Sequence, residues 1–447
     1  MREKISFIGL GKLGLPLSTL FAKNNIPVLG IDTNKKLIDK LQDNMFTPFF
    51  EKGLGRSLDL AYNNMEYTTS YDRVMDETDV SVILVNTQIG DSYSSDVVEN
   101  VIKNLCAELV KSRKKYHLFI LSSTVMPGEI RNKLIPMIEK LTDRKLNIGF
   151  GFSYVPDIVK LGSVIEDFEN PDVVIIGGSD YRSISITHDL YKTIPVNDPV
   201  TSQMTLEEAE IAKVTLNAYL VNKISFANFV SNLCESMDNV NVDNITNAIG
   251  YHKPIGHQFL KGGLGFGGTC FPRDTKAFID FSRKLGHHAS HLIATDTINN
   301  EQHQRLFERV MSYDKKSISI LGLSFKPNTS VIKESPSMKL AEHLVKVGKE
   351  VNLYDPLCLE YVESVFSKFP YDRMRDEPQI NYYNSMKVCF RQGEVVVVAL
   401  PLEEFKSIDD SWKSHDDQLI LDCWRVLNSS DFEKIKYECL GERSQYV

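Results

Sequence analysis

One stretch of the chain combines a cysteine with an unusually glycine-rich backbone. Five glycines precede Cys270: Gly262, Gly263, Gly265, Gly267 and Gly268. A backbone without Cβ atoms can approach another group closely. Pro272 opens a segment, 272–285, that we predict to be a helix ending at Gly286. Cys270 then lies just outside a helix N-terminus, where unpaired N–H groups and the helix dipole favour a thiolate, so it is a candidate nucleophile.

Asp274 lies one turn into the same predicted helix. From there its carboxylate can polarise a water molecule or influence the sulfur. The alternative interpretation of the whole stretch is a glycine-rich turn followed by a small buried cysteine. The remainder of the chain decides between the two.

A second candidate site opens the chain. Residues 5–8 form a short apolar strand, residues 15–24 an amphipathic helix and residues 28–31 a second strand that ends at Asp32. Between the first strand and the helix is a G-x-G-x-x-G sequence, which is typical of dinucleotide-binding turns when an acid follows the second strand. We therefore predict an NAD site, because Asp32 can bind the ribose hydroxyls and would repel the 2′-phosphate of NADP. Its candidate residues are Gly9, Gly11, Lys12, Leu13, Gly14 and Asp32.

Polar residues follow three further predicted strands, 79–85, 118–121 and 148–152. Ligands of open parallel sheets collect at the carboxyl ends of strands. Thr87 and Thr124 are therefore candidates for cofactor or water binding, and Asp157 and Lys160 follow the third strand. The alternative is that the hydroxyls of residues 122–124, and the Asp157 carboxylate, cap the helices that come next.

The centre of the chain is predicted to be a long helix. Thr205 and Glu208 have the spacing of a capping box, and the helical pattern runs to about Met237. A helix of roughly thirty residues is about 45 Å long, enough to link two domains and to expose a face for dimer packing. Lys213 and Asn217 are four residues apart and share a face. Together they suit an oxyanion, or they form part of a solvated surface.

A second α/β unit follows. We predict strands at 318–323, 351–354, 395–400 and 419–422 and a helix at 336–347 that ends at Gly348. The loop after the first strand contains Lys326 and, further on, Lys333, which suit a phosphate. Residues 361–383 are predicted to be an irregular surface segment. The whole chain is thus predicted to contain two Rossmann-like domains with parallel sheets, joined by a long central helix, with boundaries at 1–198, 199–300 and 301–447.

Composition limits the function. The chain has 447 residues, too many for one ordinary core, and its net charge of -8 argues against a nucleic-acid partner. Its seven cysteines include no Cys-x-x-Cys pair, which favours a reducing compartment and no metal site. His287, His288 and His291 have no matching acid or thiol ligand nearby, so we assign them to a surface loop or helix start. The N-terminal run is too short for a signal peptide and no apolar run is long enough to span a membrane, so we predict a cytoplasmic protein.

With these motifs in order, the sequence resembles the UDP-glucose/GDP-mannose dehydrogenase family nearly from end to end. The most specific matches are the cysteine loop and the segment Phe325-Lys326-Pro327-Asn328-Thr329. The resemblance is strongest to UDP-glucose 6-dehydrogenases, whose pattern Gly-Phe-Gly-Gly-x-Cys-Phe-Pro-Lys-Asp is intact here except for Arg273. It implies a double oxidation of a sugar C6 alcohol to a carboxylate with two NAD+, through a thiohemiacetal and a thioester on Cys270, as in the synthesis of uronic acids for surface polysaccharides. It also implies a UDP-sugar substrate and a homodimer or higher homo-oligomer.

The resemblance also implies the roles of single residues. Lys213 and Asn217 would stabilise oxyanions, Asp274 and Asp157 would take part in acid–base work, and Thr124 would hold the catalytic water. Lys333 stands where the family has an arginine that reaches NAD. The implied substrate-binding residues are Lys160, Lys213, Phe259, Lys261, Gly267, Phe325 and Lys326.

Three departures from the family pattern bear on the substrate. Asp157 replaces a glutamate, Pro254 replaces an arginine that contacts substrate from the partner subunit, and Gln88 replaces a proline. They leave open a UDP-N-acetylhexosamine or GDP-mannose as the substrate, or a sugar-nucleotide-binding homologue without turnover. A hydroxy-acid dehydrogenase of related architecture is a further alternative, but a single hydride transfer needs no thiolate.

Overall fold

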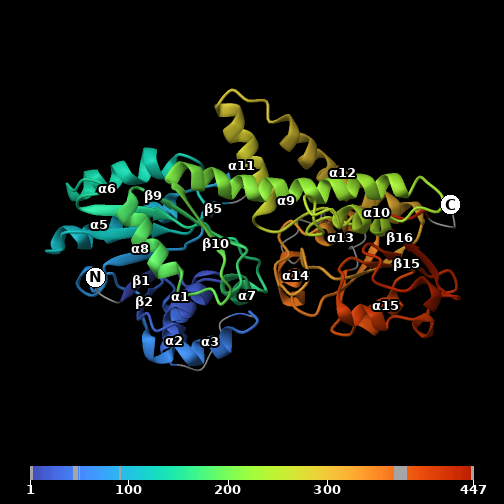
Figure 1. Cartoon of the computed structure of the whole chain (residues 1–447). Helices are drawn as coiled ribbons and strands as arrows, with labels where there is room; N and C mark the ends of the chain where they lie inside the picture. Colours follow the sequence, from blue (N-terminus) through green and yellow to red (C-terminus); the bar gives the residue numbers. More distant parts are fainter. Residues whose placement is uncertain (1–3, 44–48, 50, 90–91, 367–379, 444–447) are drawn as a thin grey trace. The chain divides into compact units, whose positions relative to one another are not determined.

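The chain divides into two compact units, Met1–Leu216 and Asn217–Val447 (Figure 1). The computed structural model describes residues 4–43, 49, 51–89, 92–366 and 380–443. Helix α9 (Leu206–Cys234) begins in the first unit and continues into the second. It starts where predicted, because the amide of Thr205 donates to Glu208 Oε2 (2.8 Å) and the amide of Glu208 donates to Thr205 Oγ1 (3.3 Å), which is the reciprocal pairing of a capping box.

The first unit is built on an eight-stranded sheet with the order β10-β9-β8-β7-β4-β1-β2-β3. The six strands from β8 to β3 in that order are parallel, whereas β9 runs antiparallel to β8 and β10 runs parallel to β9. The strands are β1 (Ile5–Ile8), β2 (Val28–Ile31), β3 (Met65–Thr68), β4 (Val80–Ile83), β7 (His117–Leu121), β8 (Phe150–Tyr154), β9 (Val173–Gly178) and β10 (Val200–Thr205). A short antiparallel pair, β5 (Gln88–Ile89) and β6 (Ser92–Tyr93), stands apart from this sheet.

Helices connect these strands, as a doubly wound sheet requires. They are α1 (Gly14–Lys23), α2 (Lys35–Gln42), α3 (Leu54–Ala61), α4 (Val74–Glu77), α5 (Asp96–Lys111), α6 (Ile135–Thr142), α7 (Val164–Glu169) and α8 (Tyr181–Tyr191), with a π-helical turn, Ile130–Leu134, leading into α6.

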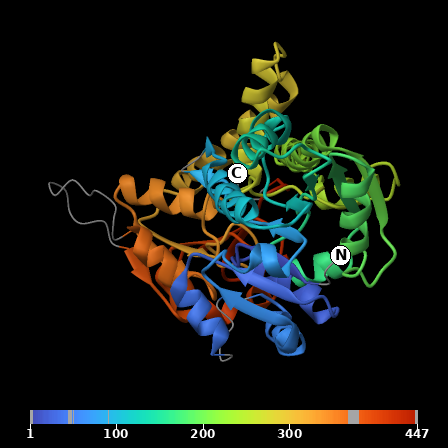
Figure 2. The ribbon, with the colours of Figure 1, turned by 90° about the vertical axis from the view of Figure 1, so that its left-hand side faces the viewer.

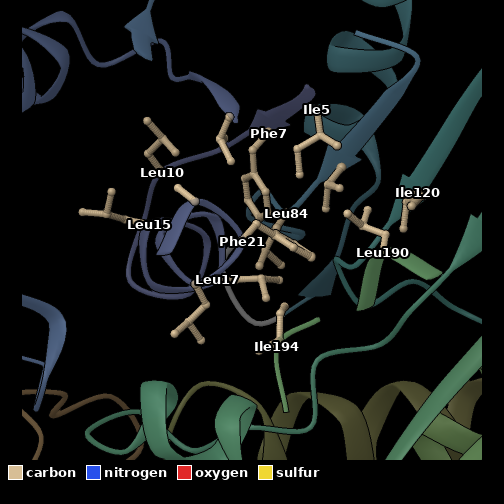
Figure 3. Packing of buried hydrophobic residues seen from close by; sticks show 14 of the residues in the cluster. Ile5, Phe7, Leu10, Leu15, Leu17, Phe21, Leu84, Ile120, Leu190 and Ile194 are labelled. Atoms are coloured by element: carbon tan, nitrogen blue, oxygen red, sulfur yellow. The ribbon is translucent and has the colours of Figure 1, made fainter. Parts of the chain in front are cut away.

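Both faces of the first sheet are buried. In β7, Leu118 and Ile120 belong to one hydrophobic cluster, while Phe119 and Leu121 belong to another. Successive side chains of a strand point to opposite faces, so a strand covered on both sides must be apolar throughout. Figure 3 shows the first of these clusters around α1 and β1. The continuous apolar runs in the sequence follow from this double cover.

The second unit contains a six-stranded parallel sheet with the order β13-β12-β11-β14-β15-β16. Its strands are β11 (Ser317–Leu321), β12 (Glu350–Tyr354), β13 (Ile380–Tyr382), β14 (Val395–Val398), β15 (Leu419–Asp422) and β16 (Lys436–Cys439). The prediction of two Rossmann-like sheets connected by a long helix is confirmed. Strands β3, β10, β13 and β16, and the separate pair β5 and β6, were not predicted.

The second unit also contains several helices, and the cysteine loop lies between the first two of them. They are α10 (Val242–Gly250), α11 (Phe271–Lys284), α12 (Ser290–Ser312), α13 (Pro336–Lys346), α14 (Leu359–Phe366) and α15 (Met386–Gln392). Helices α11 and α12, yellow in Figure 1, pack against one another, and Figure 2 shows the same pair from a second direction.

Helix α12 escaped sequence analysis for a physical reason. Its buried stripe consists of Thr295, Asn299, Gln302, Leu306 and Val310, so three of its five buried positions are polar. Hydrophobic periodicity, the main signal for an amphipathic helix, is therefore weak here. The helix runs through residue 300, where we predicted a domain boundary; that division of the chain stays a prediction.

The predicted irregular segment 361–383 was wrong at both ends, because α14 covers its start and β13 its end, and residues 367–379 lie outside the described part of the chain. None of the described helices is both long and apolar enough to cross a membrane.

A buried histidine makes the first unit sensitive to acid. His117 is fully buried in β7, and its Nε2 lies 2.8 Å from Ser81 Oγ. Burial lowers the pKa of this imidazole from 6.5 to about 3, so it stays neutral in the folded protein. Between these values the unfolded chain binds a proton that the folded chain does not, and stability must fall as the pH drops below 6.5.

We therefore expect the free energy of unfolding to fall by roughly 2 kcal/mol from this residue alone between about pH 7.5 and pH 5. In His117→Gln this part of the pH dependence should disappear, whereas the exposed control His287→Gln should keep it. Denaturant unfolding at both pH values measures the difference. An unchanged pH dependence in His117→Gln would contradict the assignment.

Candidate active site

The turn between β1 and α1 is shaped by two glycines that have no room for a side chain. Gly9 has a φ of +97°, and a Cβ added there would lie 2.3 Å from the carbonyl oxygen of Leu84. A Cβ on Gly14, the first residue of α1, would lie 1.9 Å from the carbonyl oxygen of Gly9. These two positions hold the strand and helix close together, as the dinucleotide turn requires.

Asp32 is fixed at the end of β2 by the backbone of two turns. Its Oδ2 accepts the amide of Leu10 and its Oδ1 accepts the amide of Asn34, both at 2.8 Å. Each oxygen therefore keeps acceptor capacity, because an ionised carboxylate has about four acceptor sites. Gly11 differs from its neighbours, since nothing lies within 4 Å of a Cβ added there. An open glycine beside a helix N-terminus, with a positioned carboxylate, fits the pyrophosphate and ribose of a dinucleotide.

The hydroxyls after β7 do not cap the next helix, so that interpretation was wrong. Ser123 Oγ bonds both the amide and the carbonyl of Val85 at 2.8 Å, and Ser122 Oγ lies 3.0 Å from Tyr191 Oη. The Ser123 bonds hold the ends of β4 and β7 together, and the Ser122 contact joins the end of β7 to the end of α8. Thr87 and Thr124 are both buried, at 4% and 8% exposure, at the same carboxyl ends of the sheet.

The cap at this helix start comes from Glu210 on α9, which sequence analysis missed. Its two carboxylate oxygens accept the amides of Gly128 (2.7 Å) and Ile130 (3.0 Å). The side chain is completely buried, and burial raises the pKa of this carboxyl from 4.5 to about 7. An acid three residues before Lys213 was the only available signal.

Asp157 is also not a helix cap; it pairs with Lys213. No helix starts until α7, whose first turn is held by Glu51. Lys213 Nζ donates to the carbonyl oxygen of Asp157 and lies 3.8 Å from its Oδ1, with both side chains largely buried. Lys160, by contrast, is exposed and lies 3.2 Å from Asp167 Oδ1. The structure thus brings together two of the predicted catalytic residues of the first unit.

In the second unit, Cys270 occupies the N-cap position of α11 and is exposed. The amide of Asp274 donates to the carbonyl oxygen of Cys270 at 2.8 Å, which closes the first turn of the helix. The predicted helix, with Pro272 in its first turn and Gly286 (φ +84°) after its end, is confirmed. The thiol therefore stands where the helix N-terminus favours its ionised form.

Asp274 is almost completely buried and held from two sides. Its Oδ2 accepts from Asn217 Nδ2 at 2.7 Å and its Oδ1 accepts from Arg273 Nε at 2.9 Å. Asn217 and Asp274, which were predicted separately as catalytic residues, are therefore in contact one helical turn from Cys270, and Arg273 joins them.

The glycines before Cys270 lie close to other segments of the protein, and each has a different neighbour. Added Cβ atoms would lie 2.8 Å from Ala227 O of α9 at Gly262, 2.8 Å from Cys423 O after β15 at Gly263, and 2.5 Å from Asn299 Oδ1 of α12 at Gly265.

Gly267 and Gly268 abut the loop after β11. A Cβ at Gly267 would lie 2.2 Å from Glu334 O, and one at Gly268 would lie 2.7 Å from the Phe325 ring. The predicted close approach of this backbone is thus accounted for by the fold itself.

The remaining candidate substrate residues surround this loop. Phe259 has a φ of +62°, uncommon for a bulky residue, and its ring lies edge-on to Phe271 with centroids 6.2 Å apart. Lys261 is exposed. Lys326 Nζ lies 5.9 Å from the centroid of the Phe325 ring. Lys333, which was predicted to bind the cofactor, lies in the same loop, and its carbonyl accepts the amide of Gly268 at 3.0 Å.

The described residues contain no group of three or more His, Cys, Asp or Glu side chains arranged to hold a metal ion.

Comparison with known proteins agrees with this architecture. Three domain models match along the chain: "UDP-glucose/GDP-mannose dehydrogenase family, NAD binding domain" at residues 3–195, the central domain of that family at 207–301 and its UDP binding domain at 319–429. The UDP-glucose 6-dehydrogenase AglM of Haloferax volcanii is 28% identical over 98% of this chain and 100% of its own length. A GDP-mannose 6-dehydrogenase of Pseudomonas syringae pv. tomato is 30% identical over 79% of this chain and 80% of its own. The solved UDP-glucose dehydrogenase of Pyrobaculum islandicum has a TM-score of 0.87 at 26% identity, covering 98% of this chain and 97% of that one.

The fold and the two candidate sites define a class of α/β protein in which an NAD-binding unit is followed by a unit with a cysteine at a helix N-terminus. The chain belongs to the UDP-glucose/GDP-mannose dehydrogenase family. It is thus a member of the NAD-dependent nucleotide-sugar 6-dehydrogenases, oxidoreductases whose nucleotide-sugar substrate is implied by the matched UDP binding domain.

The two glycines of the dinucleotide turn should respond differently to alanine. Gly14→Ala places a Cβ against Gly9 and should lower the melting temperature. It should also lower the affinity for NAD by at least tenfold. Gly11→Ala meets no protein atom within 4 Å, so it should leave the melting temperature unchanged. It should weaken only NAD binding, because the new methyl group would project into the open space where we expect the dinucleotide. Thermal melts and calorimetric titration with NAD+ distinguish the two effects. Unchanged NAD affinity in Gly11→Ala would exclude this face of the turn as the dinucleotide site.

Proposed function

We propose that the chain oxidises the C6 alcohol of a UDP-hexose, with UDP-glucose as the first candidate, to the corresponding UDP-uronic acid. The observation that carries this proposal is the match of residues 319–429 to a UDP binding domain, together with 28% identity to a UDP-glucose 6-dehydrogenase along its full length. The exposed Cys270 at the start of α11 supports a two-step oxidation, since a single hydride transfer needs no thiol. The seven cysteines of the chain are all free thiols, and this supports a reducing, cytoplasmic location for the protein.

The proposed chemistry divides one difficult reaction into simpler steps. Oxidation of the alcohol gives an aldehyde, and the Cys270 thiolate adds to its carbonyl carbon to form a thiohemiacetal. A second oxidation gives a thioester, which water hydrolyses to the carboxylate and the free thiol. NAD+, when bound, would supply the hydride acceptor for each oxidation, so that two molecules are used per sugar nucleotide. The residues proposed to hold it are Gly9, Gly11, Lys12, Leu13, Gly14, Asp32, Thr87, Thr124 and Lys333.

The buried polar residues would then serve the oxygen atoms of these intermediates. We assign oxyanion stabilisation to Lys213 and Asn217. Because both oxygens of Asp274 already accept hydrogen bonds from Asn217 and Arg273, we assign it mainly to orienting Asn217 and a water molecule. Asp157, paired with Lys213, is assigned to acid–base work, and Thr124 to holding the water that attacks the thioester.

The residues assigned to the sugar nucleotide are Lys160, Lys213, Phe259, Lys261, Gly267, Phe325 and Lys326. Two alternatives for the substrate follow from particular observations. GDP-mannose is the second candidate, because a GDP-mannose 6-dehydrogenase is 30% identical to this chain. A UDP-N-acetylhexosamine is the third, because Asp157 and Pro254 depart from the pattern of the UDP-glucose enzymes.

The reaction class and the sugar can be tested together. Purified protein is given NAD+ and, in turn, UDP-glucose, GDP-mannose and two UDP-N-acetylhexosamines, and NADH formed is compared with sugar nucleotide consumed. We expect about two NADH per UDP-glucose, and at most one in Cys270→Ala, because only the second oxidation needs the thiohemiacetal. Cys439→Ala, at a thiol far along the sequence, is the matched control.

Other outcomes separate the alternatives. Turnover with GDP-mannose only, or with an N-acetylated sugar only, would identify that sugar nucleotide as the substrate in place of UDP-glucose. One NADH per sugar in the wild type would exclude the thioester route. Binding of NAD+ and sugar nucleotide without any NADH would identify a binding protein.

We also propose that the chain forms a homodimer or higher homo-oligomer through the face of α9 that is exposed in the single chain. Tyr219, Phe226, Phe229 and Leu233 are 61%, 48%, 48% and 50% exposed. Their spacings of seven, three and four residues place them on one side of the helix. A row of large apolar side chains left in water is typical of a protein interface.

Charge at the centre of this row should prevent association. In Phe226→Glu we expect the oligomer to dissociate, because burying an unpaired carboxylate at an apolar interface is strongly unfavourable. Light scattering after size-exclusion chromatography measures the mass. Tyr181→Glu, at an exposed aromatic on α8, is the matched control and should keep the wild-type mass. A monomeric wild type would contradict the proposal.

A further inference from the structure

Three buried carboxamide side chains face the glycine loop from two helices of the second unit. Asn228 belongs to α9, and Asn299 and Gln302 belong to α12. They are 0%, 4% and 3% exposed. Asparagine and glutamine are rarely this deeply buried unless their polar atoms are hydrogen-bonded. Their partners are therefore informative.

All three bond the backbone of residues 263–266. Asn228 Oδ1 accepts the amide of Gly263 at 2.8 Å, and its Nδ2 donates to the carbonyl of Leu264 at 3.2 Å. Gln302 Nε2 donates to the carbonyl of Gly263 at 2.7 Å. Asn299 bonds the same residue twice: its Oδ1 accepts the amide of Phe266 at 2.6 Å and its Nδ2 donates to the carbonyl of Phe266 at 3.2 Å.

These side chains replace the pairing that a β-strand would receive from its neighbours. A buried backbone amide or carbonyl without a partner is costly, and the glycine loop is buried from residue 262 to residue 268. A carboxamide has the donor and acceptor of a peptide group in the same planar arrangement, so it can pair both. We call Asn228, Asn299 and Gln302 the amide clamp.

The clamp is connected to the cysteine through aromatic packing. The ring of Phe266, the residue that Asn299 bonds twice, lies edge-on to Phe271 with centroids 6.3 Å apart. Phe271 is the first residue of α11 and follows Cys270 directly. The next contact along the loop is the Gly268 amide on the carbonyl of Lys333. A shift of Phe266 therefore changes the packing at the residue beside the thiol.

We propose that the amide clamp positions Cys270 for attack on the aldehyde, so that Asn228, Asn299 and Gln302 are positioning residues for the second oxidation. This proposal rests on the proposed function, in which Cys270 is the nucleophile. The first oxidation requires no thiol, so the clamp should affect the two oxidations unequally. A general role in stability would lower both rates together.

Asn299→Asp is the sharpest variant, because it keeps the acceptor for the Phe266 amide and replaces the donor by an oxygen facing the Phe266 carbonyl. We expect the first oxidation to stay within about threefold of wild type and the second to fall by about 100-fold, as for a small displacement of a reacting group. The ratio of NADH to sugar should fall towards one, and trapping with a hydrazine should recover aldehyde. Asn300→Asp, at the exposed neighbour on α12, is the matched control and should behave as wild type.

Gln302→Leu is a milder variant that removes one bond to the loop and keeps the side-chain volume. It should show the same imbalance between the two oxidations to a smaller extent, and it provides the test if Asn299→Asp fails to fold. Gln304→Leu, at an exposed position, is its control. Equal losses in both oxidations, or no loss in folded Asn299→Asp and Gln302→Leu, would overturn the proposal.

A second readout is independent of turnover. The rate at which iodoacetamide alkylates Cys270, followed by mass spectrometry across pH, reports how the thiol is held. We expect the alkylation profile to shift in the clamp variants and not in their controls. If wild type forms no NADH with any sugar, the proposed function fails, and the clamp is then judged by this profile alone: an unchanged profile in the variants would refute it.

Discussion

The second unit depends on one steric constraint, which is that the backbone before Cys270 has no space for side chains. Helix α9, helix α12 and the loops after β11 and β15 all approach the glycines of residues 262–268 within the distance that a Cβ would need. A chain so enclosed cannot reach water for its amides and carbonyls, so it needs partners within the protein. The glycines and the buried carboxamides are therefore two parts of one solution: the first permit the close approach, and the second satisfy the backbone that it buries.

This constraint also explains how an exposed thiol can be held accurately. The position of Cys270 is fixed by the start of α11, and α11 begins just after the enclosed backbone ends. Asp274, one turn later, is fixed by Asn217 and by Arg273. Groups on rigid, fully hydrogen-bonded supports keep a productive geometry better than groups on free loops. Arg273 has a planar guanidinium where the family pattern has lysine, and it uses its Nε on the carboxylate next to it, which an ammonium on a longer stem cannot reproduce in the same way.

Much of the fold could be predicted because its signals are local. Short apolar runs predicted most of the strands, the capping box predicted the start of α9, and Pro272 and Gly286 predicted α11. The failures at α12, at the serines after β7 and at Asp157 share a physical cause: polar groups that are satisfied by residues far away in the sequence. Helix α12 buries Thr295, Asn299 and Gln302 against the glycine loop, so its periodicity is not hydrophobic. The serines after β7 and Asp157 resembled caps. Ser122 and Ser123 instead bond Tyr191 and Val85, Asp157 pairs with Lys213, and the real cap is Glu210.

The two Rossmann-like units contain the same kind of turn, but the aspartate in it has a different role in each unit. Gly322 follows β11 with a φ of +92°, and Asp355 after β12 accepts the amides of Leu323 and Leu357 at 2.8 Å, just as Asp32 accepts those of Leu10 and Asn34. Asp355, however, also accepts the amides of Ser324 and Cys358 at 3.2 Å and is 4% exposed. Its acceptor sites are thus filled by backbone, whereas those of Asp32 are half used. A carboxylate in this turn can bind a ribose only while it has acceptors to spare, so a nucleotide in the second unit has to be recognised by residues other than this acid.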